Sequence, residues 1–312
     1  MKEILECRLH LNIKLDIKHR EDFRNYKVNF GKAEKTLSFK PRHSVESIVN
    51  ELVDNPINYN NIEIADINSV AASLKNVQPD VIVNTVAMHN VEKCENNAIT
   101  AFAVNGIGVK NLALISFEIN SVLIHMSTDY VFDGLKQTPY LETDPPMPLN
   151  VYGNTKLSGE YFIRSITNKY FILRTSGLYG KSSCRGKNGL NFVELMLKLA
   201  REREEIRVVN NEVVSPTSTF DLANQIVKIS RSDAYGLYHA TAEGSCSWYE
   251  FAEKIFTLTN TKVKLAVANF DEFPSKVPRP KYSVLANYAL KKEGLNVLRN
   301  WFEDLEDYLK KQ

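Results

Sequence analysis

The chain has 312 residues, of which 44% are hydrophobic and 24% charged, so it is long enough for one large globular domain or two modest ones. Its net charge of +2 argues against a general nucleic-acid or membrane-surface role. Four scattered cysteines without a Cys-x-x-Cys pair indicate free thiols in a reducing cytoplasm and no metal site. The sequence shows neither a signal-peptide core nor an apolar run that approaches the roughly 20 residues of a membrane span.

The first 59 residues carry few signs of a nucleotide-binding fold. Residues 9–17 alternate apolar and polar side chains, which favours a half-buried strand, and Ser44 is placed to cap a helix. Gly31 is the only glycine before Gly106. This segment therefore lacks the Gly-x-x-Gly-x-x-Gly turn at which backbone amides approach a dinucleotide pyrophosphate.

From residue 61 the pattern becomes that of alternating strands and helices. Asp66 is a suitable N-cap for a helix that includes Val70. The apolar run 81–83 predicts a buried parallel strand, and residues 92–119 predict a long helix. His89 has no carboxylate or cysteine at ligand spacing, so we interpret it as a loop residue and not as a metal ligand.

The next strand leads to the most informative residues. Residues 122–126 form a short apolar run with β-branched members, and Ser127-Thr128-Asp129 follows where the strand ends. Open α/β sheets bind their ligands at this edge. After a proline-rich loop a helix begins near Val151, and Tyr152 and Lys156 lie four residues apart on one face of it.

This grouping suggests chemistry on a carbonyl. An ammonium beside a phenol lowers the pKa of the phenol from its usual value of about 10, which makes it a suitable general acid or base. The hydroxyl of Thr128 can bond the reacting oxygen, and a nicotinamide cofactor is needed to move the hydride. The same Tyr-x-x-x-Lys spacing at Tyr288 and Lys292 has no such hydroxyl upstream, so the combination, and not the spacing, carries the signal.

The C-terminal part continues with further strands and amphipathic helices. Residues 171–174 predict a strand, and Trp248, Phe251 and Ile255 share one apolar helix face whose role we expect to be core packing. Three helices are predicted besides, over residues 190–203, over residues 219–229 with Thr219 as a cap, and at the C-terminus around Trp301, Leu305 and Tyr308.

The segments STDYVFDG and ETDPPMPLNVYGNTKLSGE resemble the extended short-chain dehydrogenase/reductase superfamily and, within it, the dTDP-4-dehydrorhamnose reductase family. The resemblance runs from about Asn61 to the C-terminus. It implies a Rossmann-like, doubly wound parallel α/β sheet that lacks its first β-α-β unit. The implied division is an atypical segment over residues 1–60, a core over residues 61–175, and a smaller substrate-binding lobe over residues 176–312. The segment IEIADINSV, residues 62–70, looks like the family's third strand.

The resemblance also implies a function and the roles of individual residues. The family reduces a 4-keto sugar nucleotide with NADPH or NADH. In that reaction Tyr152 gives the proton, Lys156 holds the nicotinamide ribose and Thr128 orients the carbonyl. The implied cofactor-side residues are Asp66, Ile67, Val86, Ala87 and Asn105, and the implied substrate-side residues are Asp129, Asn191 and Arg279. Asp66 and Asn191 can equally be helix-start residues.

Two departures from the family pattern leave alternatives open. The stretches RNYKVNF and KTLSFKP resemble the C-terminal tail of sugar-nucleotide epimerases and dehydratases, although residues 1–59 can also be an unusual lobe. Gly177 stands where the reductases commonly carry a tryptophan that packs on the sugar nucleotide. The chain is thus either a working reductase or a non-catalytic sugar-nucleotide-binding or regulatory subunit. Because the missing strand exposes the centre of the sheet, we expect the N-terminal segment, a second copy or a partner chain to cover it.

Overall fold

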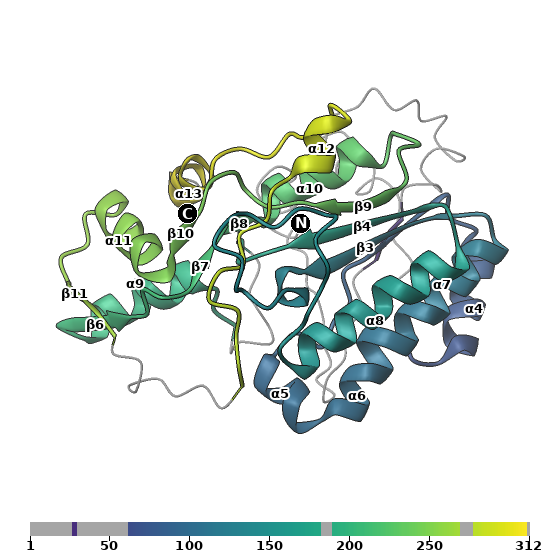
Figure 1. The fold of residues 1–312 in the computed structure, drawn as a ribbon, viewed down its shortest axis with the longest axis horizontal. Helices are drawn as coiled ribbons and strands as arrows, with labels where there is room; N and C mark the ends of the chain where they lie inside the picture. Colours follow the sequence, from purple (N-terminus) through teal and green to yellow (C-terminus); the bar gives the residue numbers. More distant parts are fainter. Residues whose placement is uncertain (1–26, 30–61, 182–188, 269–276, 311–312) are drawn as a thin grey trace, which may run out of the picture.

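A computed structural model describes residues 27–29, 62–181, 189–268 and 277–310. Its main sheet has five strands in the order β1-β2-β3-β4-β9, shown in Figure 1. The strands are β1 (Lys27–Asn29), β2 (Val81–Asn84), β3 (Val122–Thr128), β4 (Tyr170–Thr175) and β9 (Gly236–His239). Strands β2, β3, β4 and β9 are parallel, whereas β1 runs antiparallel to β2. The parallel sheet is the one expected of a Rossmann-like fold.

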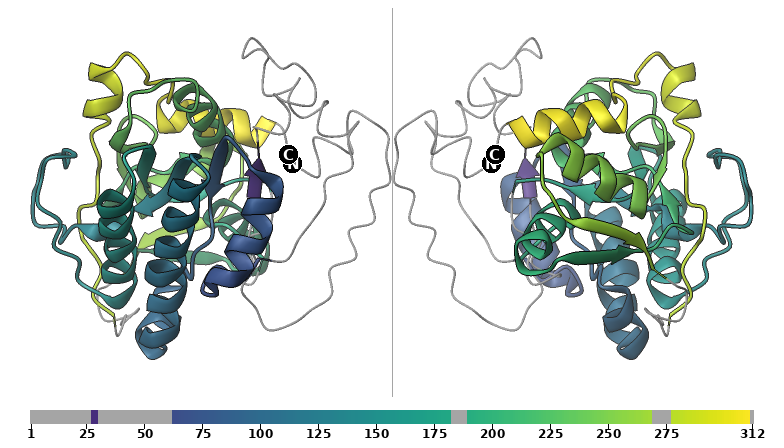
Figure 2. Two further views of the ribbon diagram at one scale, coloured as in Figure 1. Left: turned by 90° about the vertical axis from the view of Figure 1, so that its right-hand side faces the viewer. Right: turned by 90° about the vertical axis from the view of Figure 1, so that its left-hand side faces the viewer.

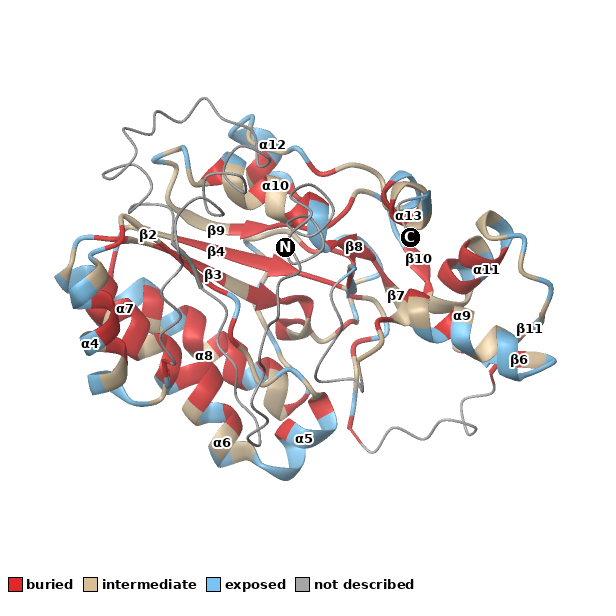
Figure 3. Ribbon diagram, turned by 180° about the vertical axis from the view of Figure 1, so that it is seen from behind, coloured by how far each residue is buried: buried red, intermediate tan, exposed pale blue. Residues whose placement is uncertain are grey.

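Helices cover both faces of this sheet (Figures 1 and 3). One face carries α4 (Ile67–Val77), α7 (Gly108–Glu118) and α8 (Val151–Ile166), and the other carries α10 (Thr219–Ile229) and α12 (Tyr288–Lys292). Strands covered on both faces read as continuous apolar runs, which is why the sequence predicts β2, β3 and β4 correctly. The helix that carries Tyr152 and Lys156 begins at Val151, as predicted.

A smaller lobe is built from the C-terminal half of the chain. It contains α9 (Phe192–Glu202), α11 (Trp248–Leu258) and α13 (Trp301–Lys310) with the short parallel pair β6 (Glu205–Val208) and β11 (Lys264–Val267). Its core includes Phe251, Ile255 and Leu305, with Trp248 packed against it, which confirms the predicted packing role of that helix face. The remaining elements are β5 (Leu178–Tyr179), β7 (Val213–Val214), β8 (Thr217–Ser218) and β10 (Cys246–Ser247), which form short pairs near the junction with the main sheet.

The predicted third strand in the segment 62–70 is wrong. Ile62 and Ile64 are buried in the core, but the backbone there is irregular and leads directly into α4. The side-chain amide of Asn111 on α7 donates to the carbonyl groups of Ile64 and Ala65, so these acceptors are satisfied without a neighbouring strand. Asp66 is the N-cap of α4 and accepts from the backbone amide of Asn68 at 2.9 Å, as its helix-start interpretation predicts.

The predicted long helix over residues 92–119 is interrupted. It consists of α5 (Val91–Asn96), α6 (Ala98–Phe102), the π-helical turn η1 (Ala103–Ile107) and α7. Contrary to the expectation from sequence, residues 98–118 are long and apolar enough to cross a membrane by length and composition. More than half of their most apolar window is buried, and they pack against α4 and α8, so this is a core helix of the folded domain.

The edge of β2 is where, from the sequence, the first strand of the sheet is expected to be missing. Lys27, Val28 and Asn29 of β1 pair there with Asn84, Val83 and Ile82, so the N-terminal segment supplies the neighbour of β2 (Figure 2). The N-terminal segment is thus seen to cover the edge of the sheet with the three residues of β1, as expected. The predicted strand over residues 9–17, the helix capped by Ser44 and the resemblance to an epimerase tail lie outside the described residues, apart from β1. A homodimer or partner chain stays a prediction.

Candidate active site

Thr128 is fixed at the carboxyl end of β3, which pairs with parallel strands on both sides. Its hydroxyl is buried, donates to the Asp129 carboxylate at 3.0 Å and accepts from the backbone amide of Tyr130 at 3.2 Å. That second bond starts the single 3-10 turn η2 (Asp129–Val131). The turn directs the chain away from the sheet and leaves the hydroxyl at the strand end, as predicted.

The first turn of α8 packs directly against η2. Asn150 is the N-cap, and its side chain accepts from the Gly153 amide at 2.9 Å and donates to the Pro278 carbonyl at 2.9 Å. A Cβ atom at Gly153 would lie 2.2 Å from the Tyr130 carbonyl oxygen, so this position requires glycine. The close approach brings Tyr152 beside η2, where its ring meets that of Tyr130 edge-on, with centroids 5.6 Å apart.

Tyr152 and Thr128 are brought together, as the sequence predicts. The Thr128 hydroxyl lies close enough to the phenol to favour the phenolate. Burial has the larger effect and raises the pKa of Tyr152 above its ordinary value. The expected lowering of this pKa is therefore wrong for the protein without ligand, and Tyr152 is a phenol that keeps its proton through the neutral range.

Lys156 lies one turn further along α8, but its amine is directed to β3. Its Nζ atom lies 2.5 Å from the Met126 carbonyl oxygen and 3.2 Å from Nε2 of His125. Burial lowers the pKa of Lys156 to about 8, although the negative charge of Glu160 acts in the opposite direction. Lys156 is thus near Tyr152 along the helix, while its hydrogen-bond partners belong to the strand below.

Asp129 and Asn105 take part in bonds within the protein. Burial raises the pKa of Asp129, opposed by hydroxyl donors on Ser283 at 2.6 Å, Ser176 at 2.8 Å and Thr128. The carboxylate therefore ties β3 to the turn after β4 and to the C-terminal segment. The Asn105 amide bonds both backbone groups of Met88 and the hydroxyl of Thr155, which fixes the loop after β2 against α8.

The two remaining substrate-side residues differ. Asn191 is the N-cap of α9 and forms a capping box with Glu194. Its side-chain amide also donates to the Gly180 carbonyl and to the Tyr308 hydroxyl. The structure thus agrees with the interpretation of Asn191 as a helix-start residue. Arg279 forms an ion pair with Glu92 on α5. Burial raises the pKa of Tyr130, and the nearby charge of Arg279 opposes this rise. The Nε–H group of Arg279 is buried and has no hydrogen-bond partner among the described residues.

The other cofactor-side residues lie near the ends of β2 and α4. Val86 is buried in the core, and its backbone amide donates to the side-chain oxygen of Asn84. Ala87 is half-buried, and Ile67 is 40% exposed at the start of α4, beside the cap residue Asp66. Their contact with a cofactor stays a prediction.

Sequence reasoning missed the buried polar groups beneath the site. Glu160 accepts two bonds from Arg174 on β4, at 3.0 and 2.7 Å, and one from Ser127 at 2.5 Å. Its spacing was a usable signal, because Tyr152, Lys156 and Glu160 repeat every four residues along one helix face. His125 and Asn84 were also missed. A polar residue inside an apolar strand was the only sign of His125.

The residues at the strand ends fit one half of a nicotinamide dinucleotide. The Tyr152 phenol and the Thr128 hydroxyl lie together at the end of β3, whereas the Lys156 amine bonds the Met126 carbonyl beneath them. No matching site is seen for the pyrophosphate of the cofactor, because the described residues offer no glycine-rich turn next to β2 and Gly31 lies outside them.

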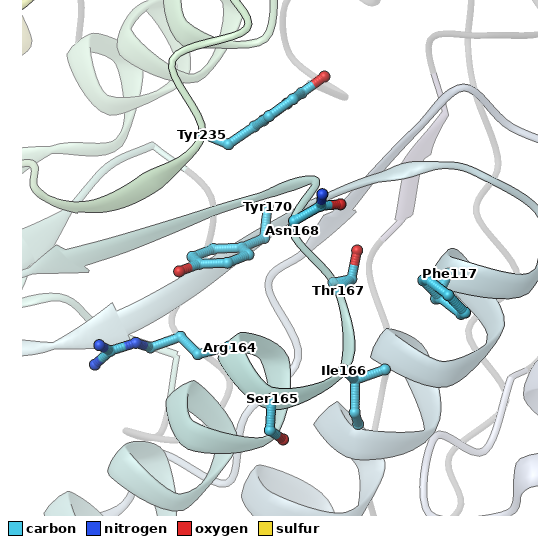
Figure 4. A pocket seen from close by; sticks show the side chains of 8 residues that line it. All are labelled: Phe117, Arg164, Ser165, Ile166, Thr167, Asn168, Tyr170 and Tyr235. Atoms are coloured by element: carbon cyan, nitrogen blue, oxygen red, sulfur yellow. The ribbon is translucent and has the colours of Figure 1, made fainter.

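A surface hollow of about 430 Å³ lies away from the candidate active site, at the opposite end of β4. It is lined by Phe117, Arg164, Tyr170, Tyr235 and neighbouring residues (Figure 4).

A Rossmann-like sheet with a threonine at a strand end and a Tyr-x-x-x-Lys helix beside it defines the class of short-chain carbonyl reductases. The model of the RmlD substrate binding domain matches residues 44–312. The chain is 41% identical over 251 residues to the spore coat polysaccharide biosynthesis protein SpsK of Bacillus subtilis, covering 80% of this chain and 86% of that protein. It is 36% identical to the dTDP-4-dehydrorhamnose reductase of Sinorhizobium fredii, over 78% of this chain and 84% of that protein.

Solved structures agree with these relatives. A dTDP-4-dehydrorhamnose reductase of Clostridium acetobutylicum superposes with a TM-score of 0.75 at 40% identity, covering 79% of this chain and 86% of that one. The dTDP-4-dehydrorhamnose reductase of Bacillus anthracis, solved in complex with NADP, superposes with a TM-score of 0.77 at 39% identity, covering 80% and 87%. The chain described here belongs to the RmlD family of dTDP-4-dehydrorhamnose reductases.

Proposed function

We propose that this chain reduces the 4-keto group of a dTDP-linked sugar with NADPH or NADH, in the biosynthesis of a polysaccharide. The observation that carries the proposal is the close approach of Thr128, at the end of β3, and Tyr152, in the first turn of α8 against η2, with Lys156 one helical turn away. The relatives named as reductases of dTDP-4-dehydrorhamnose or dTDP-4-keto-6-deoxy-D-glucose support the substrate class. The NADP complex of the Bacillus anthracis relative supports the cofactor class.

Tyr152 is the proton donor in this proposal. A bound nicotinamide cofactor supplies the hydride. Because burial keeps the pKa of Tyr152 high, its hydroxyl is protonated when a ketone arrives and can give that proton to the developing alkoxide. The hydroxyl of Thr128 bonds the same oxygen and holds the carbonyl against the phenol. Lys156 contributes an N–H group on the side of the cofactor ribose.

Arg279 is the proposed anchor for the diphosphate of the sugar nucleotide. It is close enough to Tyr130 for its charge to oppose the rise that burial causes in the pKa of that phenol, and the ring of Tyr130 touches that of Tyr152. Its unpartnered Nε–H is a donor already desolvated by the protein, and such a group gains most from a charged acceptor. A phosphate oxygen would satisfy it while the ion pair with Glu92 persists.

The pyrophosphate of the dinucleotide has no comparable donors in the described residues. A charge-assisted hydrogen bond is worth about 1.5–3 kcal/mol, so loss of two or three weakens binding by roughly two orders of magnitude or more. We therefore expect the chain to bind a sugar nucleotide more tightly than a nicotinamide dinucleotide. The alternative to a working reductase is a non-catalytic sugar-nucleotide-binding subunit. The absence of pyrophosphate donors among the described residues favours this alternative.

Two measurements separate these functions. Calorimetric titration of the purified chain with dTDP-sugar and with NADPH gives both affinities, and tight NADPH binding without sugar-nucleotide heat would contradict the expected order. NADPH oxidation with a dTDP-4-keto-6-deoxy sugar then tests catalysis. Tyr152→Phe should abolish oxidation and leave sugar-nucleotide affinity nearly unchanged. Tyr161→Phe, at an exposed position on the same helix, is the matched control and should keep full activity. An unaffected rate in Tyr152→Phe would remove that residue from its role.

A further inference from the structure

The segment that carries Arg279 runs beside β7 of the smaller lobe. The Val213 amide donates to the Lys281 carbonyl at 2.8 Å, and the Ser283 amide donates to the Val213 carbonyl at 2.9 Å. These bonds form a parallel bridge between β7 and the segment. Glu212, the residue directly before β7, is therefore held next to Arg279.

Glu212 is a carboxylate without a cation of its own. Its side chain is partly buried, and it takes part in no ion pair among the described residues, whereas Arg279 is paired with Glu92. The charges of Glu212 and Arg279 nevertheless affect the pKa of each other, so the two groups lie near each other without an ion pair. The Nε–H group of Arg279 also lacks a partner among the described residues.

The protonation of Glu212 depends on what surrounds it. Burial raises the pKa of Glu212 and so favours the neutral form, while the charge of Arg279 and the nearby indole N–H of Trp248 oppose this rise. An anion bound at Arg279 would act in the same direction as burial, because a second negative charge beside a carboxylate favours its protonation. By linkage, a ligand that favours protonation must itself bind more tightly once the proton is present.

We infer that Glu212 takes up a proton when a diphosphate binds to Arg279, so that the affinity for a sugar nucleotide rises as the pH falls. The charge of Glu212 opposes an anionic ligand, and protonation removes this opposition. The inference rests on the proposed role of Arg279 as the diphosphate anchor. It requires no catalysis, so it applies equally to a working reductase and to a non-catalytic binding subunit.

The other carboxyl groups near the site already have donors. Glu92 is bonded to Arg279, and Asp129 is enclosed by three hydroxyl donors. Glu250 accepts from the backbone amide of the N-cap of α11 at 2.7 Å. Glu212 is therefore the carboxylate on which a bound diphosphate acts most strongly.

The remaining ionisable groups around Glu212 do not change this result. Lys281 belongs to the same segment as Arg279, but it is exposed, so water and salt screen its charge. Burial raises the pKa of Tyr130 and that of Tyr152, so both phenols stay neutral when the carboxyl group titrates.

Calorimetric titration of the cofactor-free chain with dTDP-rhamnose tests the inference. The diphosphate of this probe stays fully ionised in the range used, so proton uptake belongs to the protein. Titrations in two buffers of different ionisation enthalpy give the number of protons taken up. The wild type should take up protons at about pH 5–7 and bind more weakly as the pH rises. Glu212→Gln should take up none and bind about 3- to 10-fold more tightly than the wild type at about pH 8.

Glu253→Gln, at an exposed position on α11, is the matched control and should behave as the wild type. Equal or weaker binding by Glu212→Gln, or an unchanged proton count, would overturn the inference. Weaker binding would mean that the carboxylate accepts a bond from the ligand. The proton count of the wild type needs no variant, and its absence overturns the inference even where Glu212→Gln does not fold.

Arg279→Gln tests the anchor separately. It should weaken binding about tenfold or more and abolish proton uptake, because the diphosphate loses a charge-assisted hydrogen bond. If Arg279→Gln loses affinity but Glu212→Gln gains none, the inference fails and the proposed function stands. If Arg279→Gln binds as the wild type does, the anchor is refuted and the inference with it. Thermal unfolding establishes that each variant is folded.

Discussion

Replacement of Glu160 by glutamine tests the buried ion pair that supports the end of β3. Arg174 and Glu160 have side-chain exposures of 2% and 0%, and the pair is bidentate, with bonds of 3.0 and 2.7 Å. Glu160→Gln keeps the shape and the acceptor for Ser127 but removes the only carboxylate that bonds Arg174 among the described residues. Nη1 of Arg174 already lacks a partner there, so the variant leaves a guanidinium charge without compensation inside the protein.

The expected cost is about 3–5 kcal/mol, the usual penalty for removing one partner of a buried pair. That is a large part of the roughly 5–15 kcal/mol by which native proteins are stable. Equilibrium unfolding in urea, followed by circular dichroism and by tryptophan fluorescence, gives the free energy of unfolding if the two transitions coincide.

The matched control is Glu118→Gln, which breaks the ion pair of Glu118 with Lys75. Because both side chains are about half exposed, the control should lower the free energy of unfolding by only about 0–1 kcal/mol. The double variant Glu160→Leu with Arg174→Met should recover most of the loss, because it removes both charges. A Glu160→Gln variant within about 1 kcal/mol of the wild type would refute the reasoning that this charge pair is desolvated.

Two further predictions concern Lys156 and Asn191. Burial lowers the pKa of Lys156 from 10.5 to about 8, so between these values the unfolded chain binds more protons than the folded one, and the stability contributed by this residue rises with pH. The free energy of unfolding of the wild type, relative to that of Lys156→Met, should therefore rise between about pH 8 and pH 10. If this difference does not change with pH, the amine is not desolvated. Asn191→Ala should lower stability by about 1 kcal/mol through loss of the cap of α9, with KM for the sugar nucleotide nearly unchanged, and a large rise in KM at unchanged stability would instead place Asn191 in the substrate site.

Local rules of sequence account for the parts of the fold and site that were predictable. The apolar run of β3 and the four-residue spacing of Tyr152 and Lys156 each act over a few neighbouring residues. These features place the hydroxyl of Thr128 and the phenol of Tyr152 at one sheet edge. The predicted elements 171–174 and 219–229 correspond to β4 and α10 for the same reason, although the cap of α10 is Ser218 and not the predicted Thr219.

Contacts between distant residues account for what the sequence did not predict. The partners of the Asp129 carboxylate on Ser176 and Ser283 are 47 and 154 residues further along the chain. The direction of the Lys156 amine depends on His125, which the strand register and not the helix brings into place. The segment 62–70 is predicted as a strand, but residues 62–66 are irregular, with the side-chain amide of Asn111 bonded to the carbonyl groups of Ile64 and Ala65, and α4 begins at Ile67.

Transfer of deuterium tests the central claim most directly. The wild-type chain is incubated with NADPH that carries deuterium on the transferable C4 position of the nicotinamide, together with a dTDP-4-keto-6-deoxy sugar, and the sugar product is examined by mass spectrometry and nuclear magnetic resonance. Our account predicts one deuterium at C4 of the sugar, and none when Tyr152 is replaced by phenylalanine. A sugar nucleotide that binds but is recovered with its keto group intact would contradict the account and leave a binding protein.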